Sequence, residues 1–158
     1  MGVSTDGQIS FGISFDEDFE FPWNEDKYEG DIQEWWLDVT GFKPKWYPYT
    51  PDGDYKDGAD SEDPRIGQYH DEKSQWLAEN PLPVEEIIHC SYDYPMYIIA
   101  ALHTYKNANR GYPISFEPSE LKVDEDRKKD LIDFCEEYLD LSEVEDKEPK
   151  WWLSSLMG

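Results

Sequence analysis

Basic residues are scarce in this chain of 158 residues. Only 14 lysines and arginines accompany 37 aspartates and glutamates, so the formal net charge is −23 at pH 7. Nucleic acids and anionic membranes attract proteins mainly through clusters of lysine and arginine. The charge therefore excludes a protein that grips nucleic-acid phosphates and one that binds anionic membrane surfaces, and we expect no direct contact with either.

Long hydrophobic runs are also absent. The longest apolar runs, such as residues 97–102, have only about six residues, whereas a membrane-spanning helix needs about 20. Residues 1–15 lack the basic and apolar regions of a secretory signal, so we expect a cytoplasmic protein. The two cysteines, Cys90 and Cys135, should then stay reduced and act as small hydrophobic side chains.

The chain does contain enough apolar material for a folded core. Hydrophobic residues make up 38% of it and aromatic residues 16%, seven of them tryptophans. This length fits one domain, residues 1–158, and the mean hydropathy of −0.85 indicates long polar loops. We expect rings to supply much of the core, with one of Trp35 and Trp36 and one of Trp151 and Trp152 buried and the other free to be exposed.

The first half of the chain predicts one strand and two helices. Large side chains at every second position predict a strand over residues 8–15. Asp31 as an N-cap, followed by Ile32, Trp35, Trp36 and Val39 at helical spacing, predicts a helix over residues 32–40. Residues 42–63, rich in proline, glycine and aspartate, predict a long loop. A second helix begins behind Asp63 and ends before residue 80.

The second half predicts a hairpin, a helix and a last strand. Residues 86–92 and 97–103 are rich in isoleucine and aromatics and flank a short turn. Asp124 caps a third helix, and residues 151–153 add an edge strand or dock as an anchor. This order indicates an α+β fold, with a mainly antiparallel sheet of about four strands and about three helices.

Acidic residues gather in three stretches, and the first two hold our candidate binding residues. These candidates are Asp16, Glu17, Asp18, Glu20, Glu25 and Asp26 in the first stretch, and Asp52, Asp54, Asp57, Asp60, Glu62 and Asp63 in the second. The third stretch holds Glu143, Glu145, Asp146 and Glu148. A charge of −23 equals that of about 12 base pairs of DNA. Gathered on one face, these acids could occupy the basic channel of a DNA-binding enzyme. The plain alternative is that they coat all faces and keep the protein soluble.

The second acidic stretch is similar to a calcium-binding loop. Asp52, Asp54 and Asp57 could supply oxygen ligands, with Glu62 and Asp63 downstream. The spacing departs from the calcium-loop pattern, because the turn glycine falls one position late and Lys56 occupies a liganding position. These three aspartates are therefore weak metal candidates.

Motifs for catalysis are absent from the sequence. His89, Cys90 and His103 lie on the predicted hairpin, but neighbouring residues of a strand point to opposite faces, which disfavours a shared zinc ion. No signature of a nucleophilic cysteine and no glycine-rich phosphate loop occurs. We therefore expect no enzymatic activity and no cofactor.

Four segments carry a resemblance to a known group. They are "MGVSTDGQISFGISFDEDFEFPW" at the start, "EWW" at residues 34–36, "YPMYIIA" at residues 94–100 and "EPKWWLSS" near the end. In these segments the chain resembles small acidic hypothetical proteins of bacteriophages and prophages, a group without an established activity. The resemblance implies a phage accessory protein that acts in the cytoplasm of the bacterial host cell.

Together these observations favour a non-enzymatic phage or prophage protein that binds a host protein through an acidic surface. A DNA-mimic inhibitor of a nucleic-acid-processing or defence enzyme is one form of this hypothesis. The alternatives are a small structural or assembly protein with a solubilising surface, and a divalent-cation-binding module or enzyme that uses residues 52–63. An unpaired edge of a terminal strand would also allow a homo-oligomer.

Overall fold

The computed structural model describes residues 5–50 and 53–157. They divide into two compact units. The larger unit is built from the two ends of the chain, up to Glu25 and from Pro83 onward, and the smaller unit is Asp26–Leu82. The expectation of a single domain stays a prediction.

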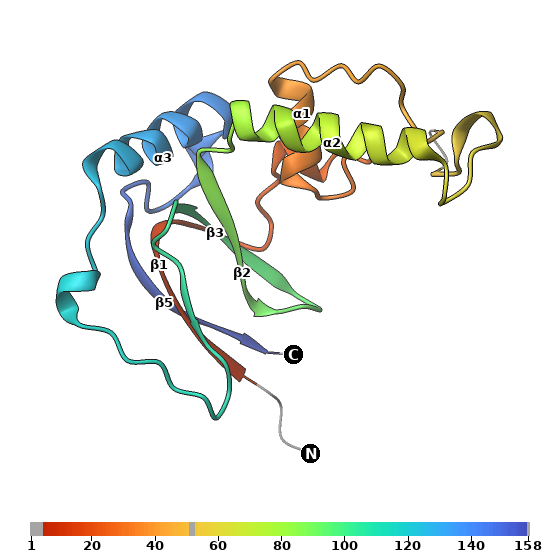
Figure 1. Ribbon diagram of the computed structural model, residues 1–158. Coiled ribbons are helices and arrows are strands. Elements are labelled where there is room, and N and C mark those ends of the chain that lie inside the picture. The colour runs from red at the N-terminus through yellow and green to blue at the C-terminus, as the bar shows by residue number, and fades with distance from the viewer. Residues whose placement is uncertain (1–4, 51–52, 158) are drawn as a thin grey trace. The chain divides into compact units, whose positions relative to one another are not determined.

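The larger unit contains the sheet (Figure 1). Its five strands are β1 (Thr5–Phe15), β2 (Val84–Ser91), β3 (Pro95–Ala101), β4 (Lys106–Ala108) and β5 (Lys150–Met157). All pairings are antiparallel except the one between β2 and β5. With the helix α3 (Glu125–Tyr138) and the two helices of the smaller unit, this confirms the α+β class.

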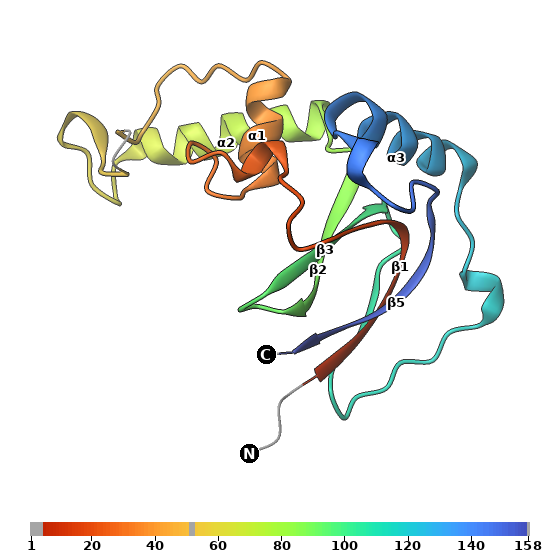
Figure 2. The ribbon, with the colours of Figure 1, turned by 180° about the vertical axis from the view of Figure 1, so that it is seen from behind.

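The sheet closes on itself. β1 pairs with β3, β3 with β2, β2 with β5, and β5 again with β1. The sequence predicts that residues 151–153 add an edge strand or dock as an anchor. They do lie in a strand, but the edge position is wrong, because β5 pairs with β1 over eight residue pairs and with β2 through Cys90 and Leu156. Figure 2 shows β1 and β5 running side by side. The first and last strands thus support each other.

The fifth strand, β4, was not predicted. Its three residues, Lys106–Ala108, have neither a β-branched side chain nor alternating polarity. It forms because Gly7, Gln8 and Ile9 of β1 lie opposite and offer backbone partners. A strand this short is specified by its neighbour and not by its own sequence.

The core of the larger unit lies between the sheet and α3. Of the large side chains predicted to alternate along β1, Ile13 and Phe15 are each 1% exposed, but Ser10 on the opposite face is also 1% exposed, so the strand is buried on both faces here. From α3, Leu131 and Phe134 pack inward and are nearly inaccessible to solvent. Trp23, in the 3-10 helix η1 (Pro22–Asn24), completes this core beside Phe134. Its indole N–H donates to a Glu86 carboxylate oxygen of β2 at 2.7 Å.

Two further 3-10 helices lie in the connections of the larger unit. They are η3 (Pro118–Glu120), before α3, and η4 (Leu141–Glu143), between α3 and β5. The side chain of Asp140 caps η4 by accepting a hydrogen bond from the backbone N–H of Ser142 at 3.0 Å. This cap fixes the path of the chain from α3 toward β5.

The smaller unit contains α1 (Ile32–Val39) and α2 (Pro64–Glu79). As predicted, Asp31 caps α1 by accepting from the backbone N–H groups of residues 33 and 34. Trp35 and Trp36 are both buried, so the structure contains the one buried ring expected of this pair and buries the second ring as well. The Trp36 indole donates to the Asn80 carbonyl at 2.9 Å, which lets that ring be buried with its N–H satisfied. Val39, expected on the buried face, is 40% exposed.

The predicted long loop connects α1 to α2. It contains the 3-10 helix η2 (Lys56–Gly58) and an isolated bridge between Tyr49 and Tyr55. Its aromatic side chains pack on α2, where the ring of Tyr47 meets that of Tyr69 edge-on at 5.6 Å. The loop is therefore irregular but anchored.

The cysteine prediction is confirmed, since Cys90 and Cys135 are both free. Cys135 is fully buried on α3, and burial raises the pKa of its thiol to about 12. The described helices are too short or too polar for any of them to cross a membrane.

Candidate functional site

A pocket of about 620 Å³ opens in the larger unit. Its walls come from the end of β1 and the turn after it, from the segment between α3 and β5, and from one residue of β5. The lining residues are Ser14, Phe15, Asp16, Asp18, Phe19, Glu20, Asp140, Glu143, Val144, Glu145, Asp146 and Trp152. We call this the acidic pocket. It joins two stretches of chain that lie more than 100 residues apart in sequence.

Seven of the twelve lining residues are carboxylates, and within the described part of the chain no lysine or arginine is among them. One of the seven, Asp146, pairs with Lys150, which stands just outside the lining. Hydrogen bonds from Ser142 lower the pKa of Asp140, so this carboxyl group stays charged at neutral pH. Charges of one sign around a concave surface concentrate the electrostatic field there.

Three lining side chains, Phe15, Phe19 and Trp152, are aromatic, and we call them the aromatic floor of the pocket. Phe15 is buried and packs against Phe19, with ring centroids 4.5 Å apart, and Phe21 contacts both rings. Trp152 is fixed by its indole N–H, which donates to the Gly12 carbonyl oxygen at 2.9 Å. The pocket therefore combines aromatic surface with negative charge, and we call its seven carboxylates the rim.

The structure distributes the first group of candidate residues over several places. Asp16, Asp18 and Glu20 line the acidic pocket. Glu17 is exposed beside them but is not part of the lining. Glu25 and Asp26 lie where the larger unit ends and the smaller begins, also outside the lining.

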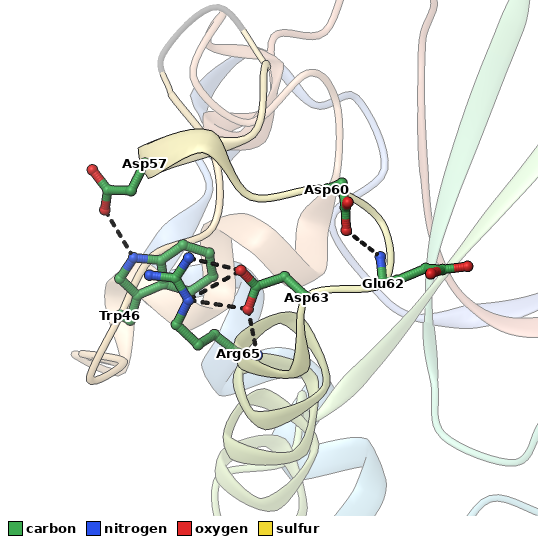
Figure 3. Close-up of polar contacts among 6 residues, drawn as sticks. All are labelled: Trp46, Asp57, Asp60, Glu62, Asp63 and Arg65. Atoms are coloured by element: carbon green, nitrogen blue, oxygen red, sulfur yellow. Dashed lines mark hydrogen bonds and ion pairs between the residues drawn. The ribbon is translucent and has the colours of Figure 1, made fainter.

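In the second group, two aspartates already have partners: that of Asp57 lies in the loop, and that of Asp63 lies on α2 (Figure 3). Asp63 caps α2 and accepts from Nε and Nη2 of Arg65, which lowers the pKa of this carboxyl group to about 2. The Arg65 guanidinium lies 4.4 Å from the centre of the Trp46 ring. The Trp46 indole N–H in turn donates to Asp57 at 3.2 Å. This arrangement uses two acids to hold the loop against α2.

The other acids of this stretch point elsewhere. Asp60 accepts from the backbone N–H of Glu62, whose own side chain extends away from the cluster (Figure 3). Asp54 is exposed, and Asp52 lies outside the described residues. Across residues 5–50 and 53–157, no three His, Cys, Asp or Glu side chains are grouped so as to hold a metal ion.

The three hairpin residues considered for metal binding, His89, Cys90 and His103, are not grouped together. His89 is half-buried, and burial lowers the pKa of its imidazole. Cys90 has a positive φ within β2, and His103 lies beyond Ala101, the last residue of β3, which pairs with Val84 at the other end of β2 from His89. The structure gives these three residues no common site.

Sequence reasoning missed two parts of the pocket. Glu143, Glu145 and Asp146 belong to the acidic stretch noted near the C-terminus, but their position opposite residues 16–20 depends on the pairing of β1 with β5. The aromatic part of the lining was missed because nothing in the sequence brings Phe19 and Trp152, which are 133 residues apart, to one place. A useful signal was available in Phe19, a ring set between the acidic residues Asp18 and Glu20.

Comparisons with known proteins add no assignment. No family model, no curated protein and no solved structure matches the chain.

Proposed function

We propose that this chain is a non-enzymatic binding protein that captures a basic segment of a partner protein in the acidic pocket. The observation that carries the proposal is the convergence of seven carboxylates from two distant segments around an aromatic floor. A lysine- or arginine-rich surface would meet opposite charge at the rim and apolar contact on the floor. A solubilising coat alone requires neither the concave shape nor the rings.

A partner with a basic surface belongs to the class of host protein that we expect, the enzymes that act on nucleic acids. Enzymes that process or cut nucleic acids carry basic surfaces for phosphate, and an acidic pocket competes for the same side chains. In this reading the chain is a phage or prophage protein that inhibits such an enzyme in the bacterial cytoplasm by mimicking DNA charge. The net charge of −23 would also speed the encounter at low salt.

Exposed large hydrophobic side chains favour a second candidate function, assembly with other proteins through apolar contacts. Tyr112, Ile114 and Phe116 are 76%, 46% and 39% exposed at alternate positions of one extended segment. Leu153 on β5 is 85% exposed. Binding through these side chains would persist at high salt, whereas binding through the acidic pocket would weaken.

The experiment that tests the proposal compares two charge-matched triple variants. Asp18→Asn, Glu20→Gln and Glu145→Gln neutralise the pocket rim, while Asp130→Asn, Glu136→Gln and Glu137→Gln neutralise three exposed acids of α3. Both sets change the net charge by +3. The probe is a fluorescein-labelled hexa-arginine peptide, followed by fluorescence anisotropy at low ionic strength.

We expect the pocket variant to bind the peptide about tenfold more weakly than wild type, because three charges near a bound cation each contribute about 0.5 kcal/mol. The α3 variant should stay within about twofold. Equal losses in the two variants would mean that the peptide responds to total charge only, and the proposal would be wrong.

A further inference from the structure

The acidic pocket already has a cation of the chain itself at its edge. The Lys150 ammonium group pairs with the Asp146 carboxylate. The same nitrogen lies 5.5 Å from the centre of the Trp152 ring. Asp146 and Trp152 both line the pocket, so one ammonium group contacts a charged wall and part of the aromatic floor together.

A carboxylate beside an aromatic face is the combination that recognises an alkylammonium or guanidinium group. The ring attracts the cation through its quadrupole, and the carboxylate neutralises it. The contacts of Lys150 therefore indicate which chemistry this corner of the pocket accepts. The proposed partner would bring the same chemistry on a lysine or arginine side chain.

We propose that Lys150 is an internal competitor, and that an arginine side chain of the partner replaces its ammonium group between Asp146 and Trp152. This inference rests on the proposed function of the acidic pocket. Arginine is the better competitor, because a planar guanidinium stacks on the indole and can bond a carboxylate through two N–H groups, whereas an ammonium group acts as a point charge.

The location of Lys150 makes the exchange feasible. Its backbone is held at the start of β5, opposite Gly12 of β1. Its side chain, like that of Asp146, is 46% exposed. An ion pair this exposed contributes little to stability, so the ammonium group can move into solvent while the strand stays in place.

The test removes the internal cation and uses a matched ion pair as a control. Lys150→Met and Lys150→Gln remove the charge and keep an unbranched side chain. Lys129→Met makes the same charge change at Lys129–Asp133, a pair with the same four-residue spacing on the surface of α3. Affinity for the labelled hexa-arginine peptide is measured by anisotropy, and urea unfolding midpoints verify that each variant is folded.

We expect both Lys150 variants to bind the peptide about fivefold more tightly than wild type, since the gain of an unmasked carboxylate and ring is of the order of 1 kcal/mol. Lys129→Met should stay within about twofold. Equal gains at both sites, or weaker binding by the Lys150 variants, would overturn the inference.

The inference and the proposed function fail in different ways. If the pocket triple variant loses affinity but the Lys150 variants gain none, the acidic pocket binds the peptide and Lys150 is not a competitor. If the pocket and α3 triple variants lose affinity equally, the proposed function fails and the inference fails with it.

Discussion

Trp152 and Gly12, 140 residues apart, are joined by a hydrogen bond of 2.9 Å from the indole N–H to the backbone carbonyl oxygen. The bond ties β5 to β1 and sets the angle of the ring that forms part of the pocket floor. The geometry of the acidic pocket therefore depends on the pairing of the first strand with the last.

Replacing Trp152 with Phe keeps a ring but removes the N–H donor. We expect the free energy of unfolding to fall by about 1 kcal/mol or more, because the variant loses the hydrogen bond and part of the buried ring. Trp151→Phe is the control, since the ring of Trp151 meets Phe11 edge-on and phenylalanine can keep that contact. Urea unfolding measures both variants, and an equal loss in the two would contradict the role given to the indole N–H.

Gly12 is required by the close approach of two strands. A Cβ atom at this position would lie 2.2 Å from the Ile99 carbonyl oxygen and 2.8 Å from the Ala100 Cα atom. We predict that Gly12→Ala lowers the free energy of unfolding by about 3 kcal/mol, at the upper end for overpacking, because backbone atoms must move. Gly7→Ala, on the same strand with nothing within 4 Å of its added Cβ, should change it by less than about 1 kcal/mol. Similar urea midpoints for the two variants would exclude the steric account.

Stability should also depend on pH through His89. Burial lowers the pKa of this imidazole, and among the described residues its Nε2 atom has no hydrogen-bond partner. The unfolded chain, with a pKa of about 6.5 at this residue, then binds a proton more readily than the folded chain does. Above a pH of about 6.5 the imidazole is neutral in both states, so His89 does not reduce the free energy of unfolding. As the pH falls below about 6.5, protonation of the unfolded chain reduces this free energy, until the pH is also below the lower pKa of the folded state.

The measurement is the free energy of unfolding of wild type minus that of His89→Gln, between pH 8 and pH 5. The subtraction removes the contribution of the many carboxylates, which both proteins share. We expect this difference to decrease as the pH falls through about 6.5, because wild type loses stability that the variant does not lose. A difference that stays constant, or increases as the pH falls, would show that burial does not disfavour the charged imidazole.

The loop between α1 and α2 should be indifferent to calcium. Asp63 is engaged by Arg65 and Asp57 by Trp46, so binding a cation would require breaking these contacts. We expect about 1 mM calcium, a concentration that fills weak extracellular sites, to leave tryptophan fluorescence and the melting temperature unchanged relative to EDTA. A saturable change that Asp57→Asn abolishes would instead support the cation-binding alternative.

Much of the fold could be predicted because local patterns specify it. The alternation in β1 and the Asp31, Asp63 and Asp124 caps identify elements that the structure contains. β4 and the internal position of β5 could not be predicted in this way, since both depend on which part of β1 remains available for pairing.

The sequence could predict that the candidate site is acidic, but not where in the fold it lies. The sequence identifies Asp16, Asp18 and Glu20 as acidic neighbours, and the pairing of β1 with β5 brings Glu145 and Asp146 to the same pocket. In the loop, Asp57 and Asp63 read as part of the same acidic surface, yet an indole and a guanidinium engage them. The sequence gives the number of charged residues, but the contacts in the folded chain determine which carboxylates can still bind a partner.

The most direct test of the acidic pocket as a binding site is a titration of the ¹⁵N-labelled protein with hexa-arginine peptide, followed through the indole N–H signals. Trp152 lines the pocket, and Trp46 provides an internal control because it lies beside Asp57 in the other unit. We predict a saturable shift of the Trp152 signal, with the Trp46 signal nearly unchanged. Equal shifts of the two signals, or a shift of Trp46 alone, would contradict binding in the acidic pocket.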